Sequence, residues 1–323
     1  MTARLILVLS CALFSTLAVP AQAKDYPDRP VKIVVPFPPA GAVDAMARII
    51  APKLAEALGG QFYVENMGGA GGDIGAAAVA NAPADGYTLL LTSPDIVVRP
   101  LIKANVPYDP VKSFAPITLV ASSPAAIVVH PSVAAKNMQE LIALLKANPG
   151  KYSVGTPGYG TLPHLEGERL YKQAHGVEVL YVPFQGYGPA VTSAVGGHIL
   201  LLGAPVAAVA PLVKDGKLRA LAVAAKARSP ALPDVPTLEE AGIKDQDAGF
   251  AGGLLVRAGT PKEIVEQLHR QMVRILSLPD VKEKLAVLGF DPIGNTPDEF
   301  AAWIRSESAK WRAVVSATNI KID

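Results

Sequence analysis

Residues 34–48 carry the clearest chemistry in the sequence, and that chemistry lies in the backbone. They are typical of the end of a buried strand (residues 31–35), a stiff loop of prolines and small residues, and the start of a helix. Ala40, Gly41 and Ala42 place no bulky side chain in front of the first N–H groups of that helix. Those N–H groups have no acceptor within the helix and lie at the positive end of its dipole. A strand that leads into such a turn is typical of an anion site, and it needs no lysine or arginine.

The same stretch also has an interpretation that needs no ligand. Many strand-to-helix turns contain prolines and small residues only because the chain reverses tightly. Asp44 fits both interpretations. In the first turn of the helix its charge complements the helix dipole, whereas beside a bound anion it would oppose binding unless a water or an ammonium group met it. Residues 34–48 alone do not distinguish the anion site from a tight turn without a ligand.

A second loop, residues 156–161, repeats this design. A strand that ends at Gly155 leads into Thr156-Pro157-Gly158-Tyr159-Gly160-Thr161, and a helix follows. The glycines give access to backbone N–H groups, and Thr161 and His164 could donate hydrogen bonds to a carboxylate. The alternative makes Thr161 a helix cap and His164 an ordinary, partly buried histidine.

Patterns typical of enzymes and cofactor sites are weak. Residues 68–75 match a loose glycine pattern of dinucleotide sites, but a close-packed turn beside a cleft explains them better. There is no G-x-S-x-G motif, the five histidines are scattered, and His164-x-Glu166 lacks a third metal ligand at usable spacing. A catalytic triad assembled only in space stays open. We predict a protein that is not an enzyme, with no catalytic residue, no cofactor and no metal.

The composition fits a large soluble fold. The chain has 323 residues, of which 50% are hydrophobic and 18% charged, so it can form one large or two ordinary domains. The net charge of +2 and the aromatic content of 6% give no reason to expect nucleic acid as a partner.

Residues 1–23 have the features of a secretory signal peptide. Arg4 provides a positive start, an apolar run follows, and Ala21-Gln22-Ala23 is an A-x-A cleavage site. We therefore predict cleavage after Ala23 and a periplasmic protein. The only cysteine, Cys11, lies within this leader, so the mature chain would contain neither a disulfide nor a thiol nucleophile.

Strands alternate with helices along the mature chain, which predicts a mostly parallel sheet covered on both faces. The apolar run of residues 117–129 is long for one strand and contains Pro124. We expect two strands there, in two domains, joined by a crossing segment near residues 121–126. A strand at residues 249–256 would be the second crossing. This organisation predicts two α/β lobes with a ligand cleft between them.

With these residues in place, the mature chain resembles the extracytoplasmic solute receptors of tripartite tricarboxylate transporters, the Bordetella-uptake-gene (Bug) type. The matching landmarks are Val34-Val-Pro-Phe-Pro-Pro-Ala-Gly-Ala-Val-Asp44, Val64-Glu-Asn66 with Gly69-Ala-Gly-Gly72, Asp85-Gly-Tyr-Thr-Leu89, Pro107-Tyr-Asp-Pro110, Gly216-Lys-Leu-Arg-Ala-Leu-Ala222, Leu232-Pro-Asp-Val-Pro-Thr237 and Ala258-Gly-Thr-Pro261. The resemblance implies a two-lobe, type II periplasmic-binding-protein (Venus flytrap) fold. It also implies that the first loop and residues 156–161 grip a carboxylate, largely through backbone groups and bridging waters.

Three positions depart from the family pattern. Ala40 stands where the first loop usually has a glycine, and Met67 stands where a polar residue is common. The strand after His198 reads Ile-Leu-Leu-Leu-Gly-Ala-Pro in place of an acidic or polar patch. This suggests a ligand with an apolar or aromatic body and one or two carboxylates.

We therefore expect a discontinuous first lobe of residues 24–123 and 249–323, and a second lobe of residues 124–248. The predicted ligand-binding residues are Phe37, Pro38, Ala40, Gly41, Ala42, Asp44, Ser93, Thr156, Pro157, Gly158, Tyr159, Gly160, Thr161, His164, Phe184, Gly203 and Ala204. The predicted protein is a monomeric receptor that delivers a di-, tri- or aromatic carboxylate to membrane permease subunits. An exported α/β hydrolase-like enzyme and a ligand sensor for a membrane signalling partner are the alternatives.

Overall fold

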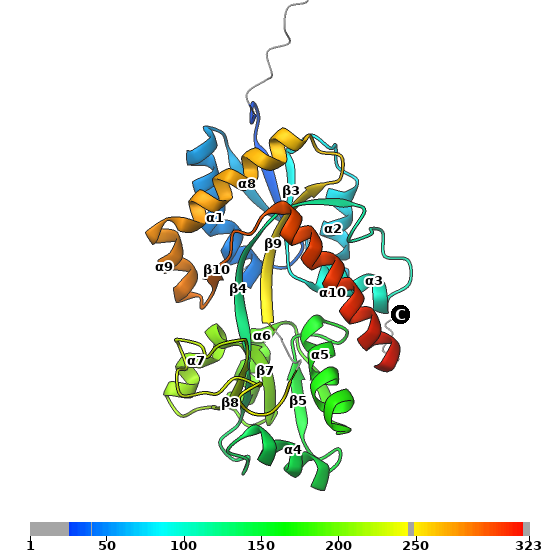
Figure 1. The fold of residues 1–323 in the computed structure, drawn as a ribbon, viewed down its shortest axis with the longest axis vertical. Coiled ribbons are helices and arrows are strands. Elements are labelled where there is room, and N and C mark those ends of the chain that lie inside the picture. The colour runs from blue at the N-terminus through cyan, green and yellow to red at the C-terminus, as the bar shows by residue number, and fades with distance from the viewer. Residues whose placement is uncertain (1–25, 40, 245–248, 319–323) are drawn as a thin grey trace, which may run out of the picture.

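The computed structural model describes residues 26–39, 41–244 and 249–318, which form two α/β lobes stacked along the long axis of the molecule (Figure 1). Strands β4 (Phe114–Val129) and β9 (Gly249–Arg257) lie side by side where the lobes meet. The chain builds most of the first lobe, enters the second through β4, and is back in the first at β9. The predicted two-lobe α/β fold is confirmed.

The first lobe is a sheet in the order β2-β1-β3-β9-β4, covered by helices on both faces. Its other strands are β1 (Val31–Val35), β2 (Phe62–Asn66), β3 (Thr88–Thr92) and the short β10 (Asp291–Pro292). Its helices are α1 (Ala42–Leu58), η1 (Ala70–Gly72), α2 (Asp73–Ala80), α3 (Asp95–Ile102), α8 (Lys262–Ser277), α9 (Pro279–Val287) and α10 (Pro297–Thr318). Strand alternation sets the layers. Ile33 and Leu89 pack with α1, α8 and α9, whereas Val34 and Leu90 pack with α2, α3 and α10.

The second lobe repeats this design on a smaller sheet. Its strands are β5 (Ser153–Thr156), β6 (Leu180–Pro183), β7 (Leu201–Pro205) and β8 (Arg219–Ala224), together with the second part of β4. Its helices are α4 (Met138–Ala147), α5 (Leu162–Gly167), the π-helical η2 (Glu168–Gln173), α6 (Tyr187–Val195) and α7 (Val206–Lys214). Because β5, β6 and β7 are parallel, the loops that follow them share one edge of the sheet.

The expectation of two separate strands within residues 117–129 was wrong, because the chain forms a single strand, β4. As far as Pro124 this strand pairs with β9, and from Ala125 it pairs with β7 and β8. Two register shifts before the change of partner interrupt the regular pairing with β9. One strand can thus serve both sheets. The partner change lies beside the lobe boundary proposed at residues 123 and 124, and that division of the chain stays a prediction.

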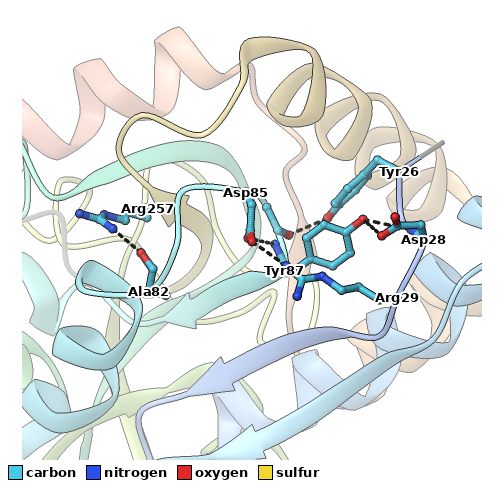
Figure 2. A network of polar contacts seen from close by, with 8 residues as sticks. Tyr26, Asp28, Arg29, Ala82, Asp85, Tyr87 and Arg257 are labelled. Carbon is cyan, nitrogen blue, oxygen red and sulfur yellow. Dashed lines mark hydrogen bonds and ion pairs between the residues drawn. The ribbon is translucent and has the colours of Figure 1, made fainter. Parts of the chain in front are cut away.

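The N-terminal segment is fixed to the first lobe by a polar network (Figure 2). The Tyr26 hydroxyl donates to the Gly86 carbonyl at 2.7 Å, and the Tyr87 hydroxyl donates to Asp28 at 2.6 Å. Arg29 pairs with Asp85 and lies over the Tyr87 ring at 4.2 Å. This network precedes β3, so it lies at the sheet edge opposite the carboxyl ends of the parallel strands. The landmark at residues 85–89 therefore has a structural role away from the predicted site.

Within the described ranges, no helix has both the length and the apolar character needed to span a bilayer. The predicted signal peptide and Cys11 lie outside the described residues.

Candidate functional site

The first predicted loop lies where β1 ends and α1 begins. Gly41 is the N-cap of α1, with φ −81° and ψ 170°, and no described side chain caps this helix. None of the described residues accepts a hydrogen bond from the N–H of Ala42 or Val43. These donors therefore point out of the positive end of a 17-residue helix, as an anion site requires. Ala40 lies outside the described residues.

The buried Asp44 side chain stabilises the first loop through hydrogen bonds. It is 3% exposed, accepts from Arg48 Nε at 2.9 Å, and accepts from Asn66 Nδ2 at 2.9 Å. Asn66 Nδ2 also donates to the Phe37 carbonyl at 3.1 Å. The negative charge of Asp44 is thus compensated by Arg48 and by the helix dipole. Phe37 packs against the core and Pro38 is exposed, so the loop is anchored on one side and open on the other.

The glycine-rich turn of residues 68–75 is held by ion pairs of Asp73 with Arg99 and Lys103. Asp73, at the start of α2, is 3% exposed and binds Arg99 at 2.9 Å and Lys103 at 3.0 Å. Arg99 also donates to the Ala70 carbonyl at 2.9 Å. Although burial opposes it, hydrogen bonding to Arg99 and Lys103 holds the pKa of Asp73 below its ordinary value. A Cβ on Gly75 would lie 2.8 Å from Pro36, which explains the glycine as a packing requirement.

In the second loop, many polar groups bond to one another. The hydroxyls of Thr156 and Thr161 both donate to the Gly158 carbonyl, at 3.1 and 2.7 Å. Thr161 is the N-cap residue of α5, but its side chain makes no capping bond. The Pro157 carbonyl accepts from Gly186, and the Thr156 carbonyl accepts from Phe184. The Thr161 hydroxyl therefore does not cap the helix, and its contact with a ligand stays a prediction.

His164 lies beneath this loop and is 1% exposed. Its Nδ1 accepts a hydrogen bond from the Gly160 N–H at 3.2 Å, which places the ring proton on Nε2. The ring stacks on Tyr159 with centroids 4.3 Å apart and meets the edge of Tyr181 at 4.5 Å. Burial lowers the pKa of His164 to about 4, so the ring is neutral near pH 7. These contacts make it a structural support of the loop, whereas the Tyr159 side chain is 53% exposed.

A carboxylate that the sequence analysis did not single out joins the two predicted regions. Asp95, in the first turn of α3, accepts from the Ser93 hydroxyl at 2.7 Å and from the Leu162 N–H at 2.8 Å. Ser93 follows β3 of the first lobe, and Leu162 begins α5 of the second. The carboxyl ends of β3 and β5 therefore face each other across the lobe boundary. In the sequence, an aspartate after Ser-Pro indicates only a helix start.

Glu166 and Tyr187 interact with this carboxylate. In the sequence, Glu166 was considered only as a metal ligand beside His164, and Tyr187 was not considered. Glu166 accepts from the Gly249 N–H at 3.2 Å, where β9 begins. Burial raises the pKa of the Glu166 carboxyl to about 8, and Asp95 adds to the rise. Burial also raises the pKa of Tyr187 well above its ordinary value, again with Glu166 and Asp95 nearby. Such a group forms only when three distant segments pack, which no single motif reveals.

The remaining predicted residues, Phe184, Gly203 and Ala204, belong to the second lobe. Phe184 and Ala204 pack in its core, and Gly203 lies in β7 opposite Ile127 of β4. Leu201 and Leu202 are each 0% exposed and face the two cores of the lobe. Neither leucine side chain is therefore exposed, and the apolar character of the ligand pocket that the sequence suggested stays a prediction.

The backbone donors at the start of α1 can bind an anion, whereas the Leu162 N–H at the start of α5 is already occupied by Asp95. Among the residues that the structure describes, no three His, Cys, Asp or Glu side chains are grouped so that they could hold a metal ion. Two α/β lobes joined through the paired strands β4 and β9 form the architecture of periplasmic binding proteins.

Comparisons with known proteins show the family. A family model described as "Tripartite tricarboxylate transporter family receptor" matches residues 46–320. Protein BugT of Bordetella pertussis is 35% identical over 308 residues, covering 95% of this chain and 94% of that protein. A protein of Pseudomonas sp. strain P51, encoded in the tcbD-tcbE intergenic region, is 37% identical over 303 residues, covering 93% and 90%. The chain belongs to the tripartite tricarboxylate transporter receptor family, whose members are solute-binding receptors and not enzymes.

Solved structures agree with this assignment. R. palustris Rpa4515 with adipate has a TM-score of 0.82 and 32% identity, covering 92% of this chain and 99% of that one. Periplasmic binding protein BugD has a TM-score of 0.80 and 34% identity, with the same coverage. MatC from Rhodopseudomonas palustris with bound malate has a TM-score of 0.78 and 31% identity, covering 90% of this chain and 100% of that one.

Proposed function

We propose that this protein captures a small carboxylate in the cleft between its two lobes. The observation that carries the proposal is the start of α1, where the N–H groups of Ala42 and Val43 have no acceptor among the described residues. The adipate and malate in two structural neighbours support the same ligand class. In this proposal the ligand carboxylate lies on α1, and residues 156–161 contact the rest of the ligand.

The available donors can provide useful affinity. A hydrogen bond to a charged group is worth about 1.5–3 kcal/mol, so the two N–H groups of Ala42 and Val43 give roughly 3–6 kcal/mol. This range corresponds to dissociation constants from several millimolar to tens of micromolar, before burial of the ligand body adds to it. Backbone donors together with burial of the ligand body can therefore give a receptor useful affinity without a basic side chain.

In this proposal the signal peptide is cleaved after Ala23, and the mature receptor is a monomer in the periplasm. There it delivers its ligand to the permease subunits of a tripartite tricarboxylate transporter. Membership of the family supports this delivery. The order of events is capture in the cleft, approach of the lobes, and docking of the loaded receptor to the permease.

A thermal-shift screen of residues 24–323 tests the proposal. The panel contains adipate, malate, citrate, benzoate and phthalate, with the matching amides as uncharged controls. We expect at least one acid to raise the melting temperature while its amide does not, and NMR of the mixture to show no turnover. Chemical conversion of the acid, or equal shifts with acid and amide, would reject a carboxylate receptor.

A further inference from the structure

The two lobes touch at a polar contact on the side of α3 and α5. Asp95 belongs to the first lobe, and its Oδ1 accepts from the backbone N–H of Leu162 in the second. Leu162 lies in the first turn of α5, where an N–H has no acceptor within the helix. The second oxygen of Asp95 accepts from Ser93, which fixes the orientation of the carboxylate. One lobe thus satisfies a backbone donor of the other.

A hydrophobic cluster supports this polar contact. It combines Val98 and Ile102 of α3, Leu162 and Leu165 of α5, and Trp311 and Val314 of α10, and all six side chains are buried. Helix α10 begins beside the first lobe and extends toward α5, as Figure 1 shows. Burial of apolar area stabilises the contact but does not select one orientation of the lobes, because the hydrophobic effect is not directional. The hydrogen bond to Asp95 is directional and fixes the position of α5 relative to α3.

A second contact joins the lobes through Gly289, which follows α9 in the first lobe. Its φ is +67°, and a Cβ built on it would lie 2.2 Å from the Cβ of Ala207, at the start of α7 in the second lobe. Ordinary contacts begin at 3.4 Å, so any side chain at Gly289 would force the two surfaces apart by more than 1 Å. Only glycine allows this approach of the lobes.

We propose that the Asp95 contact and the Gly289 contact together form the closing device of this receptor. Gly289 lets the backbones of the two lobes meet at α7, and Asp95 holds α5 against α3. The proposal concerns the positions of the lobes and does not depend on which acid the cleft binds. Since α5 directly follows residues 156–161, the device also fixes the second loop in the closed arrangement.

Distance measurements between spin labels test this proposal. Residues 24–323 contain no cysteine, so cysteines at Glu283 in α9 and Lys214 in α7, both exposed, can be labelled specifically. The label-to-label distance follows the separation of the lobes beside Gly289. Circular dichroism checks that each variant is folded.

Gly289→Ala introduces a methyl group at the contact between the lobes, and Gly294→Ala is its matched control. Gly294 also has a positive φ, +72°, but a Cβ there would meet nothing closer than 3.6 Å. Both variants therefore carry the same backbone strain, and only the first meets the other lobe. We expect Gly289→Ala to lengthen the mean distance and Gly294→Ala to leave it unchanged. Equal distributions in the two variants would overturn the role of Gly289.

Asp95→Ala tests the other contact. Removing the carboxylate leaves the Leu162 N–H without its partner, so we expect a broader distribution with a larger long-distance population than in the wild type. Asp95→Asn keeps an oxygen acceptor, so its long-distance population should lie between those of the wild type and Asp95→Ala. A distribution for Asp95→Ala identical to that of the wild type would overturn the role of Asp95.

Discussion

The loops after β1 and β5 share one design, a strand that leads through small residues and prolines into a helix, but they use their backbone donors differently. At α1, the N–H groups of Ala42 and Val43 have no acceptor among the described residues. At α5, the Leu162 N–H is bound to Asp95, and the Gly160 N–H is bound to His164. A strand-to-helix turn built from small residues is thus an anion site only when the fold leaves its donors unoccupied. We therefore propose that the first loop binds the ligand carboxylate and that the second loop chiefly positions the lobes.

The largest effect is expected from Gly41→Leu. The backbone of Gly41 is extended and a Cβ there would meet only the Pro38 carbonyl, at 3.5 Å, so the fold should tolerate the side chain. Leucine would cover the start of α1 and remove the two charge-assisted hydrogen bonds from Ala42 and Val43, about 3 kcal/mol or more. Calorimetric titration with the acid selected by the thermal-shift screen should show at least a hundredfold loss of affinity. Unchanged affinity would remove the first loop from the site.

His164→Ala should act mainly on stability. The buried ring packs between Tyr159 and Tyr181, and its loss leaves a cavity and an unpaired Gly160 N–H. We expect about 2–4 kcal/mol less unfolding free energy in urea, with ligand affinity reduced less than in Gly41→Leu. A loss of affinity without a loss of stability would make His164 a ligand donor.

The pH dependence of stability should reveal the raised pKa of Glu166. Its pKa is raised from 4.5 to about 8 in the folded protein, so folding favours the protonated form. The associated stability is fully present below pH 4.5 and is lost as the pH rises through about 8. Melting temperatures measured from pH 5 to 9 should fall more steeply in the wild type than in Glu166→Gln, which is neutral throughout. Parallel curves would show that Glu166 is charged in the fold.

The smallest effect is expected from Thr161→Val, which removes the bond from the hydroxyl to the Gly158 carbonyl. A neutral hydrogen bond contributes about 1 kcal/mol, so both stability and affinity should fall by no more than roughly that amount. A loss of affinity comparable to that of Gly41→Leu, measured with the same acid, would mean that the two loops grip the ligand equally.

The sequence predicted the strands and helices well, because the periodicity of apolar residues and the residues typical of turns depend only on neighbouring positions. The buried strand before Pro36 and the helix from Ala42 follow directly from their sequences. Three features could not be predicted. The continuity of β4 depends on a change of partner at Pro124, and the Asp95 bond depends on how the lobes meet. The burial of Leu201 and Leu202 depends on cores formed by distant segments. Each is a property of packing between parts far apart in the chain.

The most direct test is an NMR titration of ¹⁵N-labelled residues 24–323 with the acid that stabilises them best. We expect the largest amide shifts at Ala42 and Val43, whose N–H groups would donate to the carboxylate. Shifts confined to residues 158–162, with Ala42 and Val43 unmoved, would contradict the assignment of the anion to the start of α1.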